Sequence, residues 1–202
     1  MVKDAFRFVL PAVALALACA LAGWWGAASA FLAAAVLIGC FFRNPRRTIP
    51  PGDKLILSPA DGKVMCAGPA PGAEGQQLVS IFMGLLDVHV NRSPVDGVLE
   101  SLEYRRGRYR AAFRNEASGV NAQNVLTIRG RESKLVVKQI AGVLARRAVC
   151  WKSPGQALQR GEVIGLIRFG SRVDVLVPEN VRLCVRRGAR VRGGVSVLGE
   201  YP

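Results

Sequence analysis

The side chains best suited to chemistry in this sequence are a single histidine and a serine that follows a glycine. His89 is the only histidine and lies in the segment 87–94, DVHVNRSP, whereas Ser171 follows Gly170 in the segment 167–174, IRFGSRVD. An imidazole titrates near neutral pH without help, so a proton-transfer reaction would use His89 as its base. Glycine leaves the carbonyl group before Ser171 sterically open and tolerates a strained backbone. The pair therefore indicates attack by the serine hydroxyl on its own backbone.

A third segment, residues 58–64 with the sequence SPADGKV, adds a carboxylate at Asp61. Asp61, His89 and Ser171 together supply the acid, base and hydroxyl of a serine–histidine–aspartate relay. Each also has a purely structural interpretation, as a turn residue, a core histidine and a tight connection between strands. The serine lacks the Gly-x-Ser-x-Gly pattern of common hydrolases. The relay is therefore a hypothesis that requires three distant segments to meet.

The composition of the chain points to a negatively charged partner. Lysine and arginine exceed aspartate and glutamate by 28 to 14, which gives a formal net charge of +14 over 202 residues. Such an excess suits either nucleic acid or anionic lipid. An uncharged apolar run close to the N-terminus favours anionic phospholipid and a membrane surface, and argues against nucleic acid.

That apolar run covers residues 8–42, which contain no charged side chain. A single straight helix of this length would be roughly 50 Å long, against a hydrocarbon core of about 30 Å. The sequence GWWG at 23–26 divides the run, and basic residues flank both ends. We therefore predict a helical hairpin over residues 1–42 that dips into or barely crosses the membrane, with both ends on the cytoplasmic face of the cell membrane. One tilted span is the alternative.

The remainder of the chain predicts a mostly β protein. Residues 43–53 form a basic, proline-rich linker, and residues 54–202 alternate short apolar runs with Gly, Pro, Asn and Asp. This pattern indicates a compact β-sandwich or barrel-like catalytic domain without a convincing amphipathic helix. The predicted strands are 54–57, 63–67, 78–83, 88–90, 97–104, 125–129, 134–140, 143–151, 162–169, 172–177, 181–186 and 191–198.

One stretch, residues 104–121, interrupts the strand pattern with five arginines interleaved with aromatic residues. A solvated basic loop is the plain interpretation. The functional one is a clamp on lipid headgroups, with arginines on phosphate. Its predicted substrate contacts are Arg108, Tyr109, Arg114 and Asn121.

The five cysteines are odd in number and widely spaced, which is typical of reduced thiols in a cytoplasmic domain. With one histidine and no zinc spacing, we expect no metal.

The three segments 58–62, 87–94 and 169–175, in this order and behind an apolar N-terminus, resemble the phosphatidylserine decarboxylase proenzymes of the short, pyruvoyl-dependent class. The resemblance covers essentially the whole chain, and it rests on the combination of motifs. It implies an enzyme that makes phosphatidylethanolamine and CO2 from phosphatidylserine in phospholipid biosynthesis, with a pyruvoyl group and without pyridoxal phosphate.

The resemblance also implies roles for single residues. His89, oriented by Asp61, would deprotonate Ser171, which would attack the Gly170 carbonyl and cut the chain between 170 and 171. Ser171 would become the pyruvoyl group that forms a Schiff base with the serine amine of the lipid, and His89 would supply the proton after CO2 leaves. The two fragments would stay associated as a heterodimer through strand pairing.

The sequence departs from the family at two places: Leu86 stands where longer members have a second histidine, and Asn-Ala-Gln at 121–123 replaces a common Asn-Glu-Arg. Two other functions remain open. One keeps the chemistry but acts on another lipid with a serine headgroup. The other is a non-catalytic, membrane-anchored β module similar to lipoyl carriers, which would need an exposed lysine where this chain has Gly170-Ser171.

Overall fold

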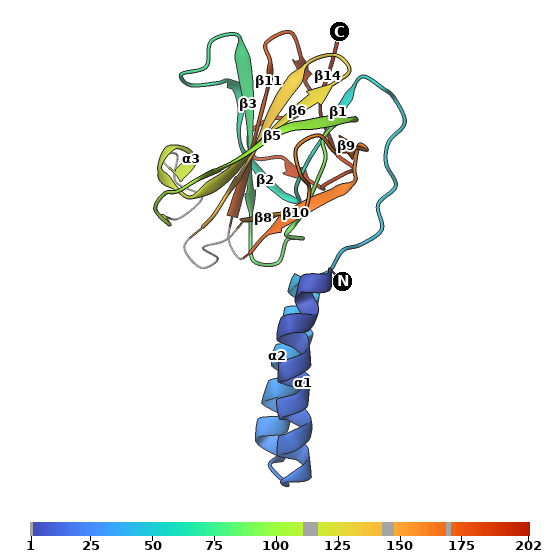
Figure 1. The fold of residues 1–202 in the computed structure, drawn as a ribbon, viewed down its shortest axis with the longest axis vertical. Helices are drawn as coiled ribbons and strands as arrows, with labels where there is room; N and C mark the ends of the chain where they lie inside the picture. Colours follow the sequence, from blue (N-terminus) through green and yellow to red (C-terminus); the bar gives the residue numbers. More distant parts are fainter. Residues whose placement is uncertain (1, 111–116, 143–147, 169–170) are drawn as a thin grey trace. The chain divides into compact units, whose positions relative to one another are not determined.

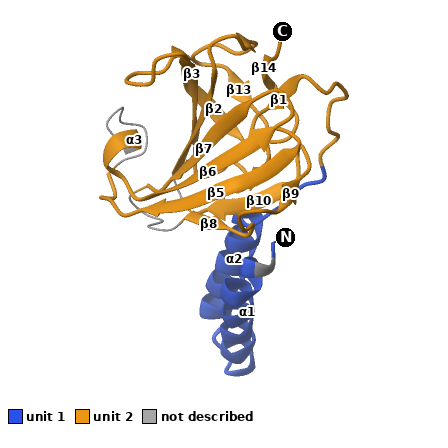
Figure 2. Cartoon of the chain, turned by 45° about the horizontal axis from the view of Figure 1, so that its top comes forward, with its two compact units in different colours: residues 1–46 blue, residues 47–202 orange. Residues whose placement is uncertain are grey.

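The structure, a computed structural model, describes residues 2–110, 117–142, 148–168 and 171–202. It divides into two compact units, residues 1–46 and 47–202, which Figure 2 draws in blue and orange. The division falls within the predicted linker, and it assigns Arg47 to the second unit.

The first unit is the predicted helical hairpin, which is confirmed. A short 3-10 turn, Lys3–Ala5, leads into α1 (Phe6–Leu21), and α2 (Trp25–Phe41) follows. Gly23 has a φ of 77° between the helices, a conformation that glycine adopts without steric cost. One straight helix is therefore excluded.

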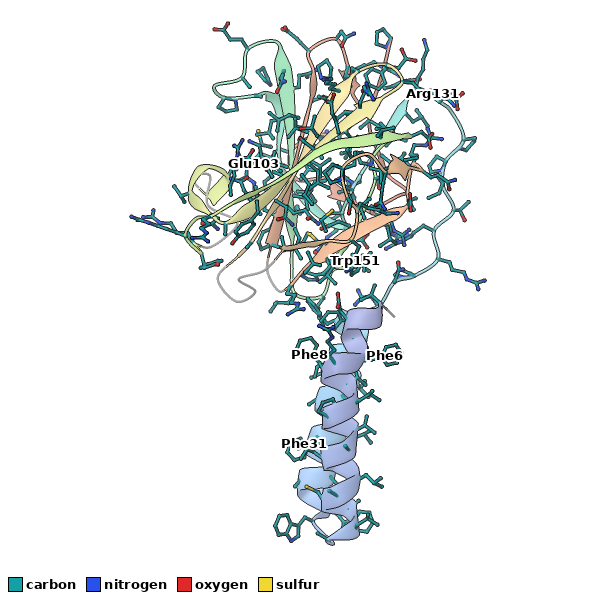
Figure 3. The ribbon with its side chains drawn as sticks, viewed as in Figure 1. Phe6, Phe8, Phe31, Glu103, Arg131 and Trp151 are labelled. Atoms are coloured by element: carbon teal, nitrogen blue, oxygen red, sulfur yellow. The ribbon has the colours of Figure 1, made fainter. Side chains whose placement is uncertain are left out.

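The hairpin keeps most of its apolar side chains on its surface. Leu21 and Trp25 are 81% and 72% exposed, and Phe6 and Phe8 project outward in Figure 3. No helix in the described part of the chain reaches the length and apolarity that a bilayer crossing requires. A surface of this apolarity is typical of a contact with lipid or protein.

The second unit is built from strands in three sheets (Figure 1). The eight-stranded sheet has the order β13-β2-β3-β11-β7-β6-β5-β9, and the three-stranded sheets have the orders β1-β14-β12 and β4-β10-β8. The strands are β1 (Leu55–Leu57), β2 (Gly62–Pro69), β3 (Gln76–Met83), β4 (Val90–Arg92), β5 (Gly97–Arg105), β6 (Gln123–Gly130), β7 (Lys134–Ile140), β8 (Ala148–Cys150), β9 (Ala157–Leu158), β10 (Val163–Ile167), β11 (Ser171–Pro178), β12 (Arg182–Leu183), β13 (Arg190–Val191) and β14 (Val197–Glu200).

The large sheet curls into a half-barrel, and this confirms the predicted fold class (Figure 1). Alternate residues of its strands, such as Ile81, Leu126 and Val173, are fully buried in one apolar core. Because side chains alternate between the faces of a strand, this pattern places every second residue of β11 in the core, beginning with Ser171. The central strand thus delivers the candidate nucleophile to the interior.

One expectation for this unit was wrong. The predicted strand 191–198 is two strands, β13 and β14, because the chain turns at Gly194, where φ is 74°. The described part of the stretch 104–121 includes a short helical turn, α3 (Ala117–Val120), and is otherwise compatible with the predicted loop.

Candidate active site

Ser171 is the first residue of β11, between β3 and β7 in the middle of the large sheet. It pairs with Met83 of β3, and its side chain is fully buried. The hydroxyl donates to Met83 Sδ at 3.4 Å, a weak acceptor that leaves the oxygen available for reaction. Gly170, the other half of the predicted cleavage site, lies outside the described residues.

His89 lies just before β4 and is 1% exposed. Its Nδ1 is 2.8 Å from the carbonyl oxygen of Asp87, which holds the ring in one orientation. The backbone of His89 accepts a hydrogen bond from Ile167 N at 3.1 Å. Ile167 ends β10, and the chain passes from there to Ser171. The fold therefore brings the histidine segment to the strand that leads into the candidate nucleophile.

Asp61 contacts an arginine and a backbone amide. Its carboxylate accepts hydrogen bonds from Arg47 Nη2, at 2.7 and 3.0 Å, and from Gly193 N at 2.7 Å. Among the described contacts of this carboxylate there is no hydrogen bond to His89. Burial, followed by the charge of Arg47, lowers the pKa of Arg92, whereas Asp61 raises it. Asp61 therefore pairs with Arg47 and also favours the charged form of Arg92.

The loop that carries Asp61 also supports the strand after His89, because Arg92 N donates to Pro59 O at 2.9 Å. Through this contact, Asp61 can influence the position of His89 indirectly.

Asp61→Asn should lower the free energy of unfolding by about 1–3 kcal/mol, since it removes the charge that compensates Arg47 and Arg92. The same substitution should slow self-cleavage. Thermal unfolding and the rate of chain cleavage check the two effects separately. A variant that unfolds earlier but cleaves at the wild-type rate would restrict Asp61 to a structural role.

The predicted substrate contacts fall into two groups. Arg108 is exposed and Tyr109 is 37% exposed, so both are accessible to a ligand. Asn121 is buried, and its amide nitrogen donates to Arg110 O and Ala141 O. Both amide hydrogens of Asn121 thus serve to hold the loop. Arg114 lies outside the described residues.

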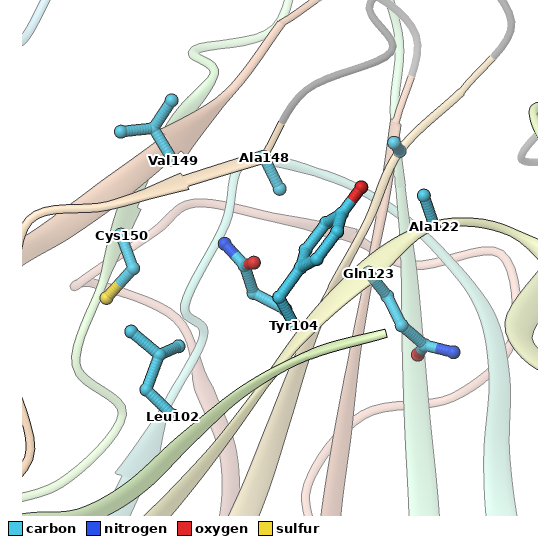
Figure 4. Close-up of a pocket in the computed structure, with 9 residues that line it drawn as sticks. Leu102, Tyr104, Ala122, Gln123, Ala148, Val149 and Cys150 are labelled. Carbon is cyan, nitrogen blue, oxygen red and sulfur yellow. The ribbon is translucent and has the colours of Figure 1, made fainter. Parts of the chain in front are cut away.

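A cavity of about 460 Å³ is lined mainly by residues of β5, β6 and β8 (Figure 4). Ile140 pairs with Arg172, so the next residue of that chain segment, Ala141, lies opposite Ser171, and Ala141 lines the cavity. The full lining is Leu102, Tyr104, Ala122, Gln123, Asn124, Ala141, Ala148, Val149 and Cys150. Burial raises the pKa of the Cys150 thiol, which is therefore neutral at pH 7 and acts as an apolar wall.

The departures from the family pattern have distinct positions. Ala122 and Gln123, which stand where the family commonly has Glu and Arg, line the cavity and therefore change its wall directly. Leu86, in contrast, is 88% exposed. Within the described ranges, no cluster of three or more His, Cys, Asp or Glu residues could hold a metal ion.

Several polar residues of this region were not predicted from the sequence. Gln139 lies on the same strand face as the core residues Leu135 and Val137, and Asn124 lies on the same face of the neighbouring strand as Leu126. A polar residue at a core position of a strand could have indicated this region, because buried amide side chains require hydrogen-bond partners.

Comparison with known proteins agrees with this geometry. Residues 35–199 match the family model described as phosphatidylserine decarboxylase. The chain is similar to phosphatidylserine decarboxylase proenzymes from Carboxydothermus hydrogenoformans (38% identity, covering 99% of this chain and 96% of the relative) and Solibacter usitatus (42%, covering 94% and 92%). It is also similar to that of Geotalea uraniireducens (40%, covering 98% and 95%). The chain therefore belongs to the phosphatidylserine decarboxylase family.

Proposed function

We propose that this protein is a self-processing phosphatidylserine decarboxylase, which converts phosphatidylserine to phosphatidylethanolamine and CO2 for phospholipid biosynthesis. The observation that carries the proposal is the position of Ser171. It is a buried serine at the start of the central strand, in register with Ala141 of the cavity wall, and Ile167 of β10 donates a hydrogen bond to the backbone of the only histidine. Membership of the family supplies the reaction and the lipid.

Self-cleavage follows from these residues. His89 removes the hydroxyl proton of Ser171, and Oγ attacks the carbonyl carbon of Gly170. The amide becomes an ester, and the amine of residue 171 is freed. Loss of the Cα proton then breaks the Cβ–O bond, which releases a chain that ends in the carboxylate of Gly170. The dehydroalanine left at 171 takes up water and loses ammonia to become a pyruvoyl group.

The fragments 1–170 and 171–202 remain associated because strand pairing crosses the cut. β11 belongs to the smaller fragment and pairs with β3 and β7 of the larger. β14 and β13 add pairings to β1 and β2. The product is therefore a heterodimer that is held together by strand pairing in two sheets.

The surroundings of Ser171 fit a pyruvoyl group. The hydroxyl has only a thioether as a partner in its described contacts, so conversion to a ketone abandons no strong hydrogen bond. Once formed, this group supplies the electron sink for loss of CO2. The cavity next to Ser171 receives the serine headgroup, and His89 returns the proton to the product. Arg108, Tyr109, Asn121 and Arg114 are proposed to bind or position the lipid phosphate.

The N-terminal hairpin is proposed to hold the enzyme on anionic lipid at the cytoplasmic face of the membrane. Its exposed apolar side chains suit the acyl region, and basic residues near a membrane contribute roughly 1 kcal/mol each. Deletion of residues 1–46 should leave a domain that self-cleaves at the wild-type rate but binds anionic vesicles more weakly. Sedimentation with vesicles and a cleavage time course measure both.

A second truncation, of residues 1–47, provides the matched control because it also removes Arg47 and its ion pair with Asp61. It should be less stable than the first. If the protein without residues 1–46 fails to cleave itself, the hairpin is part of the catalytic unit.

The proposed function is tested by incubation of the full-length protein with vesicles that contain phosphatidylserine. Release of CO2 with formation of phosphatidylethanolamine supports it. A parallel experiment uses vesicles that contain another lipid with a serine headgroup. Turnover of that lipid alone would favour the alternative that the enzyme acts on a different lipid backbone. A protein that stays uncut and releases no CO2 from either lipid would point to the non-catalytic module.

A further inference from the structure

A tight turn with two exposed leucines lies between the strand partner of Ser171 and the only histidine. The chain leaves β3 at Met83, which pairs with Ser171, and reaches His89 after a short connection. Within this connection Leu85 is 57% exposed and Leu86 is 88% exposed. Leu86 is the most exposed large apolar side chain in the part of the sequence that the structure describes. The rim of the candidate active site thus presents apolar surface to its surroundings.

The turn covers residues 84–87 and is held in shape by Asp87. Asp87 N donates to Gly84 O at 3.1 Å, and the Asp87 carboxylate accepts from Gly84 N at 2.8 Å. Leu85 and Leu86 therefore occupy the two corner positions of the turn, which in proteins usually carry Gly, Pro, Asn, Asp or Ser. The leucine side chains do not fill the core, and the turn does not require them. Their apolarity therefore indicates a contact outside the chain.

Basic side chains lie beside this turn. Arg190 Nη1 is 3.4 Å from Asp87 Oδ1 and offsets the acidic charge of the turn. Arg190 pairs with Lys63, and Lys63 pairs with Phe82 of β3. Because directly opposite residues on paired strands point to the same face, Lys63 and Arg190 form an exposed basic pair next to the turn. Apolar corners with basic neighbours match an anionic bilayer, where leucine enters the acyl boundary and cationic groups stay at the level of the phosphates.

The turn also lies at a suitable distance from the site. The Cα atoms of directly paired antiparallel residues, such as Met83 and Ser171, are about 5 Å apart. The step along the chain from Met83 to Leu86 spans at most about 11 Å, so the Cα atoms of Leu86 and Ser171 lie within about 16 Å of each other. The headgroup layer on each side of a bilayer is roughly 5–8 Å thick. A turn that enters this layer therefore brings Ser171 close to the height of the lipid headgroups.

We propose, on the basis of the function given above, that this turn inserts Leu85 and Leu86 into the boundary between the headgroups and the acyl chains of an anionic bilayer. Lys63 and Arg190 bind lipid phosphate beside it. The N-terminal hairpin keeps the enzyme on the membrane, whereas the turn orients the active site toward the lipid. The turn acts on access of the bilayer substrate and takes no part in making or breaking bonds.

The double variant Leu85→Ser/Leu86→Ser tests this role in the full-length protein, because serine suits the corners of a turn. The variant should cleave itself as wild type does. Decarboxylation is then measured on phosphatidylserine in anionic vesicles and on a short-chain phosphatidylserine that is dissolved as monomers. On vesicles kcat/KM should fall about 10-fold, which corresponds to the loss of less than one fully buried leucine. On monomers it should be unchanged, because the docking step is then absent.

The matched control is Leu85→Met/Leu86→Met, since methionine keeps the apolar character at a similar volume. This variant should resemble wild type on both substrates. An equal loss on vesicles and monomers in the serine variant would show that the change distorts the site beside His89, and it would overturn the inference. Wild-type turnover of vesicle lipid by the serine variant would overturn it as well.

A fluorescence experiment keeps the test decisive if the serine variant fails to fold or to cleave. It uses Leu86→Trp in a full-length chain whose three tryptophans are removed by Trp24→Phe, Trp25→Phe and Trp151→Phe. Anionic vesicles with brominated acyl chains should quench this fluorophore. Absence of quenching on vesicles that bind the protein would overturn the inference.

Two further outcomes have distinct meanings. Self-association of the wild-type protein without lipid, if Leu86→Ser abolishes it, would assign the turn to a second copy of the chain and overturn the inference. A wild-type protein that decarboxylates neither form of phosphatidylserine would overturn the proposed function. The quenching experiment then still decides whether the turn enters a bilayer.

Discussion

Ser171→Ala is expected to leave one uncut chain without decarboxylase activity. The substitution removes the only oxygen that can attack the Gly170 carbonyl, and no other serine in the chain follows a glycine. Because the side chain is fully buried and its hydroxyl donates to a thioether, a weak acceptor, among the described residues, the loss of stability should be small. Denaturing electrophoresis after translation shows whether the chain stays whole.

The matched control is Ser93→Ala, since Ser93 is equally buried and donates to Val95 O at 2.7 Å. It should cleave normally although it loses a stronger hydrogen bond. A Ser171→Ala protein that is cut after residue 170 at the normal rate would be incompatible with Ser171 as the nucleophile.

His89 substitutions should produce the second largest effect, slowing self-cleavage by about 10²- to 10⁴-fold, the usual contribution of a positioned base. His89→Asn is the sharper variant, because its amide nitrogen can keep the hydrogen bond to Asp87 O that Nδ1 makes. It therefore preserves the turn before β4 and removes only the basic nitrogen. His89→Ala removes both.

The two variants separate chemistry from folding. If the histidine serves as the base, both should be equally defective in cleavage, although His89→Asn unfolds at a higher temperature than His89→Ala. Normal cleavage of His89→Asn would assign His89 a structural role. The base would then have to be sought elsewhere.

The fold was predictable from sequence because alternation of apolar and polar residues is a local property. Each predicted strand overlaps a strand of the structure, and the predicted 134–140 coincides with β7. The pattern failed at 191–198, where a glycine turn interrupts an otherwise continuous apolar run.

The site was predictable only in part, because hydrogen-bond partners depend on contacts between distant segments. Arg47 is one of the basic residues that follow the apolar run, a pattern that predicts a membrane flank, whereas the fold pairs it with Asp61. Gln139 could have been recognised as a polar residue in a core position. Its partners Asn91 and Asn124 lie on other strands, and no local pattern connects them.

The most direct test of this account is the intact mass of the purified full-length protein under denaturing conditions. The account predicts two chains, residues 1–170 and 171–202, of which the smaller has no N-terminal amine and reacts with a carbonyl reagent. A single chain that retains an unmodified Ser171 would contradict it.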